Sequence, residues 1–383
     1  MLRRPIAAMR HHLPLLLCLS VTTLSVHAVE EISEADRAML EGIIKMGEAG
    51  TPIPKHPIPK DLLIKALQTP SPKPEFWEQA MPNDFTVDAE QALQDARDYL
   101  NNLPPPSKAE LAALKQRTQR NLVHFSGGTF TMGDFGWWET PPWPITTEEE
   151  DDPPHSVTLS GFSIQTYRVT FADYDLFTRA KRLPAINTGD YFGGLRFRYP
   201  DYPAGSVAWP QARDYCLWLG DITGQPFDLP TEAQWEYAAR SGGREVFFAA
   251  PPEAEKDVGK LNEILNKAAE GRSPDHFNSR PVGTYPPNRA GVYDMAGYGL
   301  EWVFDWYAPY GKASQIDPKG PDSGTLKVLR YVSSDPSKGV TSRRGEAATL
   351  KIHRKSLDLE YELIASTVNL NFRCALNKPK PWK

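Results

Sequence analysis

The sequence contains little cysteine, few long apolar runs and no marked excess of charge. Three cysteines in 383 residues exclude a small scaffold held together by many disulfides. The formal net charge is −5, so the composition does not favour a nucleic-acid partner. Hydrophobic residues make up 40% and charged residues 24%, which is an ordinary globular mixture. We therefore expect a folded chain that binds no nucleic acid.

Several common catalytic motifs are also missing. The chain contains no G-x-S-x-G nucleophile elbow, no H-E-x-x-H zinc motif and no phosphate-binding loop. Its eight histidines are scattered, and no pair has the spacing of metal ligands on one helix. The sequence therefore predicts neither a serine hydrolase nor a histidine-based metalloenzyme.

The longest apolar run lies near the N-terminus, from Leu13 to Val26. Arginines at positions 3, 4 and 10 precede it, and Val26-His27-Ala28 fits cleavage after Ala28. The run has about 14 residues, fewer than the roughly 20 that span a bilayer, which favours a cleaved signal over an uncleaved anchor. We expect residues 1–28 to be a signal peptide. The mature protein is then exported to a bacterial periplasm and has no membrane span.

Cleavage of this signal would leave two cysteines, Cys216 and Cys374. An even number in an oxidising compartment permits one disulfide, and the alternative is two buried free thiols. A bond would close a loop of about 160 residues and contribute about 4–5 kcal/mol in the chain-entropy model.

Residues 29–122 differ in composition from the rest of the chain, because prolines interrupt short helical patterns. Apolar spacing predicts helices over Ala35–Met46, Val87–Leu103 and Ser107–Gln119. Ser107 is a plausible N-cap, and Glu110 would complete a capping box. The segment contains no catalytic motif. We expect a helical, proline-rich extension that packs on the main domain or on a partner.

Residues 123–383 mix strand and helix patterns. Val123–Gly133 and Ser156–Thr170 alternate like strands, whereas Phe171–Ala180 and Pro210–Leu219 have helical spacing. No β-α-β rhythm is present, which favours an α+β fold over a parallel sheet.

Sequence motifs in this main domain occur in a characteristic order. They are FTMG at 130–133, PAGSVAW at 203–209, LPTEAQWEYAAR at 229–240, GVYDMAGYGLEW at 291–302 and FRC at 372–374. In this order they resemble the sulfatase-modifying-factor family, whose archetype is the formylglycine-generating enzyme. The resemblance implies an irregular α+β fold, distantly similar to C-type lectins. It also implies a structural disulfide between Cys216 and Cys374.

The run LPTEAQWEYAAR can be interpreted without the family as a structural helix. Thr231 can cap it, and Glu232, Glu236 and Arg240 follow at intervals of four residues. We expect these side chains to form ion pairs and hydrogen bonds, and we assign none of them a catalytic role.

The resemblance also implies structural calcium, as one or two ions. Carboxylate and carbonyl oxygens in a tight turn suit this cation. The first expected site consists of Asp294, Gly297, Gly299 and Glu301, and its alternative is a hydrogen-bonded turn. The second consists of Asn262, Glu263, Asp275 and Phe277, and its alternative is an ordinary polar loop.

The oxidase chemistry of the family depends on two cysteines that bind copper(I), a soft ion that prefers thiolates. Ungapped counting places Pro336 and Thr341 at those positions. We therefore expect no copper, no catalytic residue and no formylglycine-generating activity. Other branches use iron with an H-x-x-x-H-x-E signature, which this sequence lacks.

These observations favour an exported, non-catalytic member of the family that binds another protein. The family includes a periplasmic regulator among the type VI secretion accessories, which acts with an outer-membrane lipoprotein upstream of a threonine kinase. We expect a similar role, with the lipoprotein or the periplasmic domain of the kinase as partner. The expected binding cleft contains Trp306, Tyr307, Arg330 and Arg343. The alternative is a periplasmic maturation enzyme that acts on a small molecule such as a siderophore precursor.

Overall fold

The computed structural model describes residues 57–70, 87–138, 153–189, 194–269, 280–296, 299–332, 341, 344–348, 352–356, 359–363 and 370–383. The helices and strands named below belong to one compact unit. Its α-helices are α3 (Lys60–Gln68), α5 (Ala89–Asn101), α6 (Lys108–Arg120), α7 (Phe171–Lys181), α8 (Trp209–Thr223), α9 (Glu232–Ala239) and α10 (Val258–Ala269). No helix among the described residues is long and apolar enough to cross a membrane.

The strands form small and mostly antiparallel sheets, so the predicted α+β class is confirmed. One sheet has the order β1 (Leu122–Phe125), β4 (Phe162–Gln165), β13 (Ala375–Leu376), β5 (Phe227–Asp228). A second has the order β12 (Leu370–Asn371), β6 (Gly299–Trp306), β8 (Leu326–Val332), β9 (Arg344–Ala348). A third joins β2 (Gly128–Met132), β3 (His155–Leu159) and β7 (Gln315–Ile316), and β10 (Ile352–Ser356) pairs with β11 (Leu359–Leu363).

The helix predictions are confirmed wherever the structure describes the chain. Helices α5, α6, α7 and α8 coincide with predicted segments to within a few residues, whereas α3 was not predicted. The segment Ala35–Met46 lies outside the described residues.

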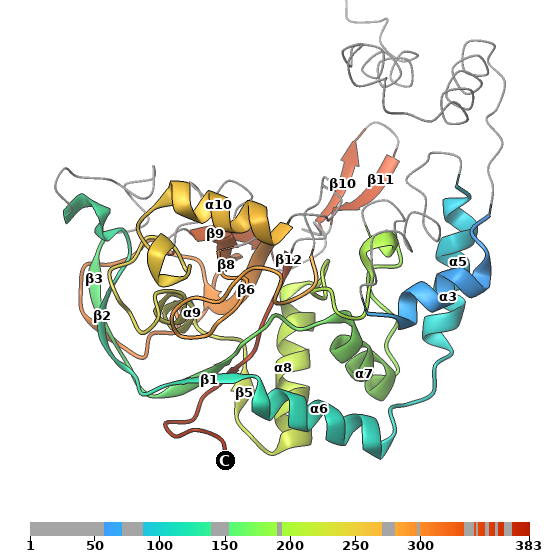
Figure 1. The fold of residues 1–383 in the computed structure, drawn as a ribbon, viewed down its shortest axis with the longest axis horizontal. Coiled ribbons are helices and arrows are strands. Elements are labelled where there is room, and N and C mark those ends of the chain that lie inside the picture. Colours follow the sequence, from blue (N-terminus) through green and yellow to red (C-terminus); the bar gives the residue numbers. More distant parts are fainter. Residues whose placement is uncertain are drawn as a thin grey trace, which may run out of the picture. The chain divides into compact units, whose positions relative to one another are not determined.

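Helix α6 of the extension has the predicted capping box. The amide of Glu110 donates to the Ser107 hydroxyl at 3.2 Å, and the Ser107 amide donates to the Glu110 carboxylate at 2.7 Å. The same carboxylate binds Arg179 of α7 at 2.8 Å, and this hydrogen bond, together with those to Ser107, lowers the pKa of Glu110 to about 2. Figure 1 shows α6 beneath α7 and α8. The extension therefore packs on the main domain through this helix.

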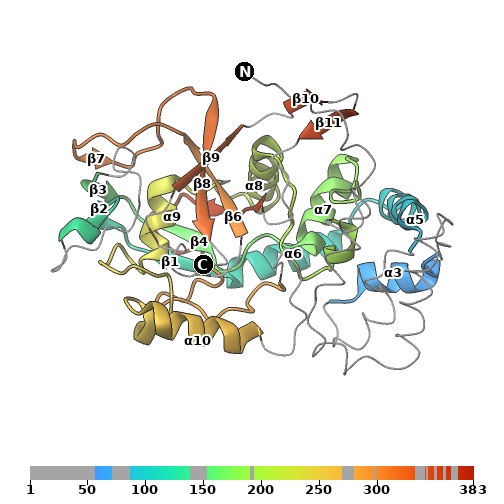
Figure 2. The same ribbon diagram turned by 90° about the horizontal axis from the view of Figure 1, so that it is seen from above.

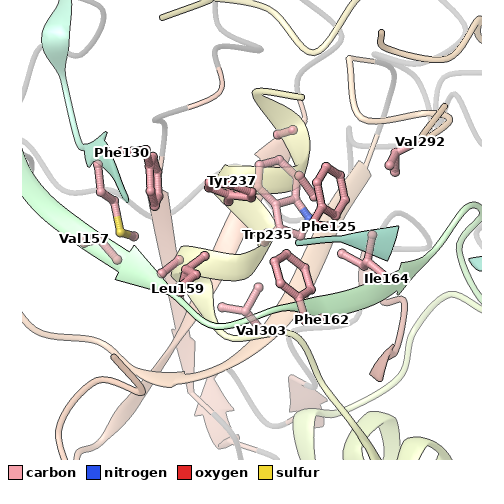
Figure 3. Close-up of a cluster of buried hydrophobic side chains, with 14 of the residues drawn as sticks. Phe125, Phe130, Val157, Leu159, Phe162, Ile164, Trp235, Tyr237, Val292 and Val303 are labelled. Carbon is pink, nitrogen blue, oxygen red and sulfur yellow. The ribbon is translucent and has the colours of Figure 1, made fainter. Parts of the chain in front are cut away.

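Helix α9 lies at the centre of the main core, and every one of its residues is buried. Its Trp235 and Tyr237 pack among apolar residues of β1, β2, β3, β4 and β6 (Figure 3). The Tyr237 ring meets Phe125 and Phe130 edge-on, with centroid distances of 5.7 and 5.1 Å. Figure 2 shows β6, β8 and β9 side by side near α9. A helix buried on all faces is unusual for a short segment with two glutamates, so these charges need partners inside the core.

Candidate functional site

Those partners are arginines. Glu236 binds Arg240 at 2.8 Å, as the i, i+4 spacing predicts. Its other carboxylate oxygen binds Arg330 of β8 at 3.0 Å, and Arg330 also binds Glu232 at 3.0 Å. The four side chains are at most 5% exposed. The predicted ladder of ion pairs is therefore confirmed for Glu236 and Arg240, and Arg330 holds Glu232 from another strand.

Arg330 was expected to line a binding cleft, and the structure gives it a different role. Its guanidinium is fully buried, and it donates to the carbonyl of Thr341 as well as to the two glutamates. Arg330 therefore holds α9 against β8. The prediction that Arg330 lines a binding cleft is wrong, because the sequence does not distinguish an arginine that faces solvent from one that is buried in the core.

Thr341 occupies the position where the resemblance places the second copper-binding cysteine. It is 1% exposed, its hydroxyl donates to the Val246 carbonyl at 2.9 Å, and its amide donates to the Phe247 carbonyl at 2.8 Å. The Thr341 hydroxyl is thus engaged in a buried hydrogen bond with the backbone. Pro336, at the other cysteine position, lies outside the described residues.

A cavity of about 290 Å³ lies beside Trp306, one of the predicted cleft residues. His155, Glu232, Asp305 and Tyr310 contribute to its wall, and the His155 and Tyr310 rings are 4.8 Å apart. The Nδ1 atom of His155 lies 3.1 Å from a backbone carbonyl, which can only accept. Nδ1 of His155 therefore donates this hydrogen bond.

Tyr307 and Arg330, the other described residues of the predicted cleft, do not line this cavity. Tyr307 is partly buried and packs against the main core. Arg330 is the buried residue described above, and Arg343 lies outside the described residues. Of the three predicted cleft residues that the structure describes, Trp306 lines this cavity and the other two do not.

A second cavity, of about 460 Å³, lies on the other side of Pro318 and Lys319, which line both. Arg213 and Asp228 face each other in its wall at 3.0 Å. Phe304 of β6 also contributes to the wall. Two cavities that share a wall form a hollowed face with aromatic and charged groups, which is typical of a ligand or partner surface.

Lys327 of β8 lies between two tryptophans next to these cavities, an arrangement that the sequence did not suggest. Its ammonium is 3.8 Å from the Trp209 ring centroid and 3.9 Å from that of Trp306, and it donates to the Phe304 carbonyl at 2.7 Å. Burial lowers the pKa of Lys327 to about 8, although nearby Asp305 opposes the change. The contacts are cation–π interactions, which fix the orientation of Trp306.

The two carboxylates of the first predicted calcium site, those of Asp294 and Glu301, both have hydrogen-bond donors as partners. Glu301 is completely buried, and it binds Arg168 at 2.8 Å and Arg373 at 2.7 Å. It also accepts the Trp235 indole N–H at 2.9 Å. Burial alone would raise the pKa of Glu301, but Arg373 and Arg168 outweigh it and lower the pKa to about 2.

The Asp294 carboxylate points to amides. It accepts the N–H groups of Gly283 at 2.6 Å and Tyr285 at 3.1 Å. Burial raises the pKa of Asp294, against the effect of Arg168 and of these amides. Gly299 belongs to β6, and Gly297 lies outside the described residues. Both carboxylates are satisfied by N–H donors, so the described geometry does not fit a calcium ion here.

The second predicted calcium site is described only in part. Asn262 and Glu263 lie in α10, where the Glu263 carboxylate binds Lys260 at 2.8 Å. Asp275 and Phe277 lie outside the described residues, so this site stays a prediction. Among the residues that the structure describes, no group of three or more His, Cys, Asp and Glu side chains could hold a metal ion.

Cys216 of α8 and Cys374 form the predicted disulfide, with Cα atoms 5.6 Å apart. Both are completely buried, and the alternative of two free thiols does not hold. The sequence contains one further cysteine, Cys18, which lies within the predicted signal peptide. The two bonded sulfurs cannot supply a thiolate pair for copper(I).

Comparisons with known proteins agree with the motif order. Residues 107–376 match the family model of the sulfatase-modifying factor enzyme 1-like domain. The chain is 30% identical over 324 residues to the formylglycine-generating enzyme of Streptomyces coelicolor, covering 70% of this chain and 95% of that enzyme. The match begins at residue 107, so it includes α6, which the sequence had assigned to the extension.

Two other relatives are not named as active formylglycine-generating enzymes. The chain is 25% identical over 302 residues to the inactive C-alpha-formylglycine-generating enzyme 2 of Mus musculus, covering 68% of this chain and 87% of that protein. It is 28% identical over 274 residues to the serine/threonine-protein kinase Pkn1 of Chlamydia trachomatis, covering 64% of this chain. This match spans 40% of the kinase.

Proposed function

This chain belongs to the sulfatase-modifying-factor family, and on that premise we propose that it is a non-catalytic member that binds a protein partner in the periplasm. The proposed role is regulation of type VI secretion through a threonine-phosphorylation pathway. The proposed partners are an outer-membrane lipoprotein or the periplasmic domain of the kinase. The export signal predicted at residues 1–28 supports this location.

The observation that carries the proposal is the chemistry at residue 341. A buried threonine occupies the position of a copper-binding cysteine, and its hydroxyl is bonded to a backbone carbonyl. Cys216 and Cys374 are joined to each other in a disulfide, so neither is a free thiolate. Without two thiolates, the copper-dependent activation of oxygen has no ligands.

The relatives support a non-catalytic and regulatory role. The similarity to a mouse protein named as inactive indicates that the fold can be kept without the oxidase activity. The similarity to a chlamydial protein kinase links a domain of this kind with phosphorylation. Both matches are at most 28% identical, so they support the class of function rather than a particular partner.

We propose that the partner docks on the face with the two cavities. Ile316 of β7 is 78% exposed there, which is high for a large apolar side chain. Its neighbours Gln315 and Asp317 line the cavity beside Trp306 and the larger cavity respectively. An exposed apolar residue between two hollows is suited to contact a complementary protein surface.

A crosslinked pull-down of the mature protein from its own cell envelope tests the proposal, with mass spectrometry of the partners. We expect an outer-membrane lipoprotein or the periplasmic domain of a kinase, and we expect Ile316→Asp to abolish its recovery. Leu183→Asp is the matched control, because Leu183 is also exposed, at 48%, but lies just beyond α7. Retention of a small molecule without either partner would instead support the siderophore-related alternative.

A further inference from the structure

The buried carboxylate of Glu301 lies at the centre of a cation site that the chain fills with its own side chains. We infer that the guanidinium of Arg168, added to that of Arg373 from the F-R-C motif, takes the place of the expected calcium ion, so that this part of the fold is independent of metal. The inference rests on which oxygens the two arginines bind, on their burial and on the balance of charge.

Arg373 binds the kinds of oxygen that a calcium ion would bind, which are carboxylate and backbone carbonyl oxygens. Its Nε and Nη2 atoms lie 2.7 and 2.8 Å from the two oxygens of Glu301. Its Nη groups also donate to the carbonyls of Gln165 at 3.2 Å, Thr166 at 3.0 Å and Tyr293 at 3.0 Å. One guanidinium therefore gathers five oxygens from β6, the end of β4 and the turn before β6.

Arg168 completes the site from a third direction. Its Nε donates to Glu301 at 2.8 Å, and its Nη2 donates to the backbone carbonyl of Asp294 at 3.0 Å. Two of the four residues expected to bind calcium, Asp294 and Glu301, are thus bridged by a guanidinium. A planar guanidinium with five donors suits this task, because it can bind a carboxylate and a carbonyl at once.

The charges in the site already cancel. Glu301 and Asp294 contribute two carboxylates, and Arg168 and Arg373 contribute two guanidiniums, all at most 5% exposed. A calcium ion added to this set would leave two uncompensated positive charges in a buried site, where an unpaired charge is costly. Calcium could enter only if an arginine left.

Terbium luminescence provides a direct test, because Tb³⁺ binds calcium sites and is excited by a nearby tryptophan. Trp235 is such a donor, since its indole binds Glu301 at 2.9 Å. The measurement is made on Asn262→Ala, which removes the second predicted calcium site. In this protein we expect no Tb³⁺ emission that calcium displaces and no change in melting temperature between calcium and EGTA. Emission that calcium displaces, or a calcium-dependent rise in melting temperature, would overturn the inference.

A substitution of Arg168 tests the replacement itself. In the Asn262→Ala background, Arg168→Gln should create Tb³⁺ emission and a rise of several degrees in melting temperature with calcium, because a carboxylate is left without one of its cations. Arg168→Lys keeps the charge and should remain insensitive to calcium. Failure of Arg168→Gln to respond while folded, or an equal response of Arg168→Lys, would refute the assignment. If Arg168→Gln folds only in the presence of calcium, the assignment is supported.

Discussion

Breaking the Cys216–Cys374 disulfide is expected to lower the free energy of unfolding by about 5 kcal/mol. The cysteines are separated by 158 positions, and the chain-entropy relation for a loop of this size gives about 17 cal/mol/K, or about 5 kcal/mol at room temperature. This is a large share of the roughly 5–15 kcal/mol that stabilises an ordinary domain. The disulfide limits the conformations of the unfolded chain, because it keeps residues 216 and 374 together after unfolding.

The assay is urea unfolding followed by tryptophan fluorescence, with and without a phosphine reductant. Reduction changes no other atom, so it avoids the cavity that Cys216→Ala would leave in a completely buried position. The midpoint should fall by about 2 M, for a slope of about 2–3 kcal/mol/M. A count of free thiols in denaturant provides the control, since it should rise by two after reduction. Unchanged midpoints despite that rise would refute the reasoning.

Further predictions concern three polar side chains. Arg330→Ala should destabilise the fold by about 3–5 kcal/mol in urea unfolding, because it leaves Glu232 and Glu236 buried without this cation; a loss below about 1 kcal/mol would contradict it. The pKa of Lys327 is about 8 in the fold against its ordinary 10.5, so the folded state binds fewer protons between these values. The contribution of Lys327 to the free energy of unfolding should therefore rise with pH from about 8 to about 10.5. Lys327→Met should make the urea midpoint less dependent on pH over that range. If the variant keeps the same dependence on pH, Lys327 is not a buried ammonium with a lowered pKa. Ser107→Ala should cost about 1 kcal/mol in the same assay through loss of the capping box, whereas Ser107→Asp should cost little.

The sequence was informative where a signal is local or where family motifs are nearly unaltered. Ser107 and Glu110 are three residues apart, so the capping box could be predicted directly. Glu236 and Arg240 are one helical turn apart, and they pair as expected. The cysteine count left two free thiols open, and the resemblance to the family implied the bond between Cys216 and Cys374 that the structure contains.

Contacts between distant segments were not predictable from one sequence. Arg168 and Glu301 are 133 residues apart, and no periodicity links them. The position of Lys327 between Trp209 and Trp306 depends on how β8 and β6 meet α8, which only the fold determines. The burial of Arg330 has the same origin, which explains why it was placed in a cleft.

The glutamates of α9 also constrain the order in which the protein can be assembled. Glu232 and Glu236 find Arg330 only 98 and 94 positions later in the sequence. A chain that emerges from its N-terminal end therefore presents α9 long before the strand that neutralises it. If α9 were buried before β8 had formed, its glutamates would lack the Arg330 guanidinium as a partner. We therefore expect α9 to stay exposed to solvent until then. We therefore expect the core around Trp235 to close only after β8 has been synthesised.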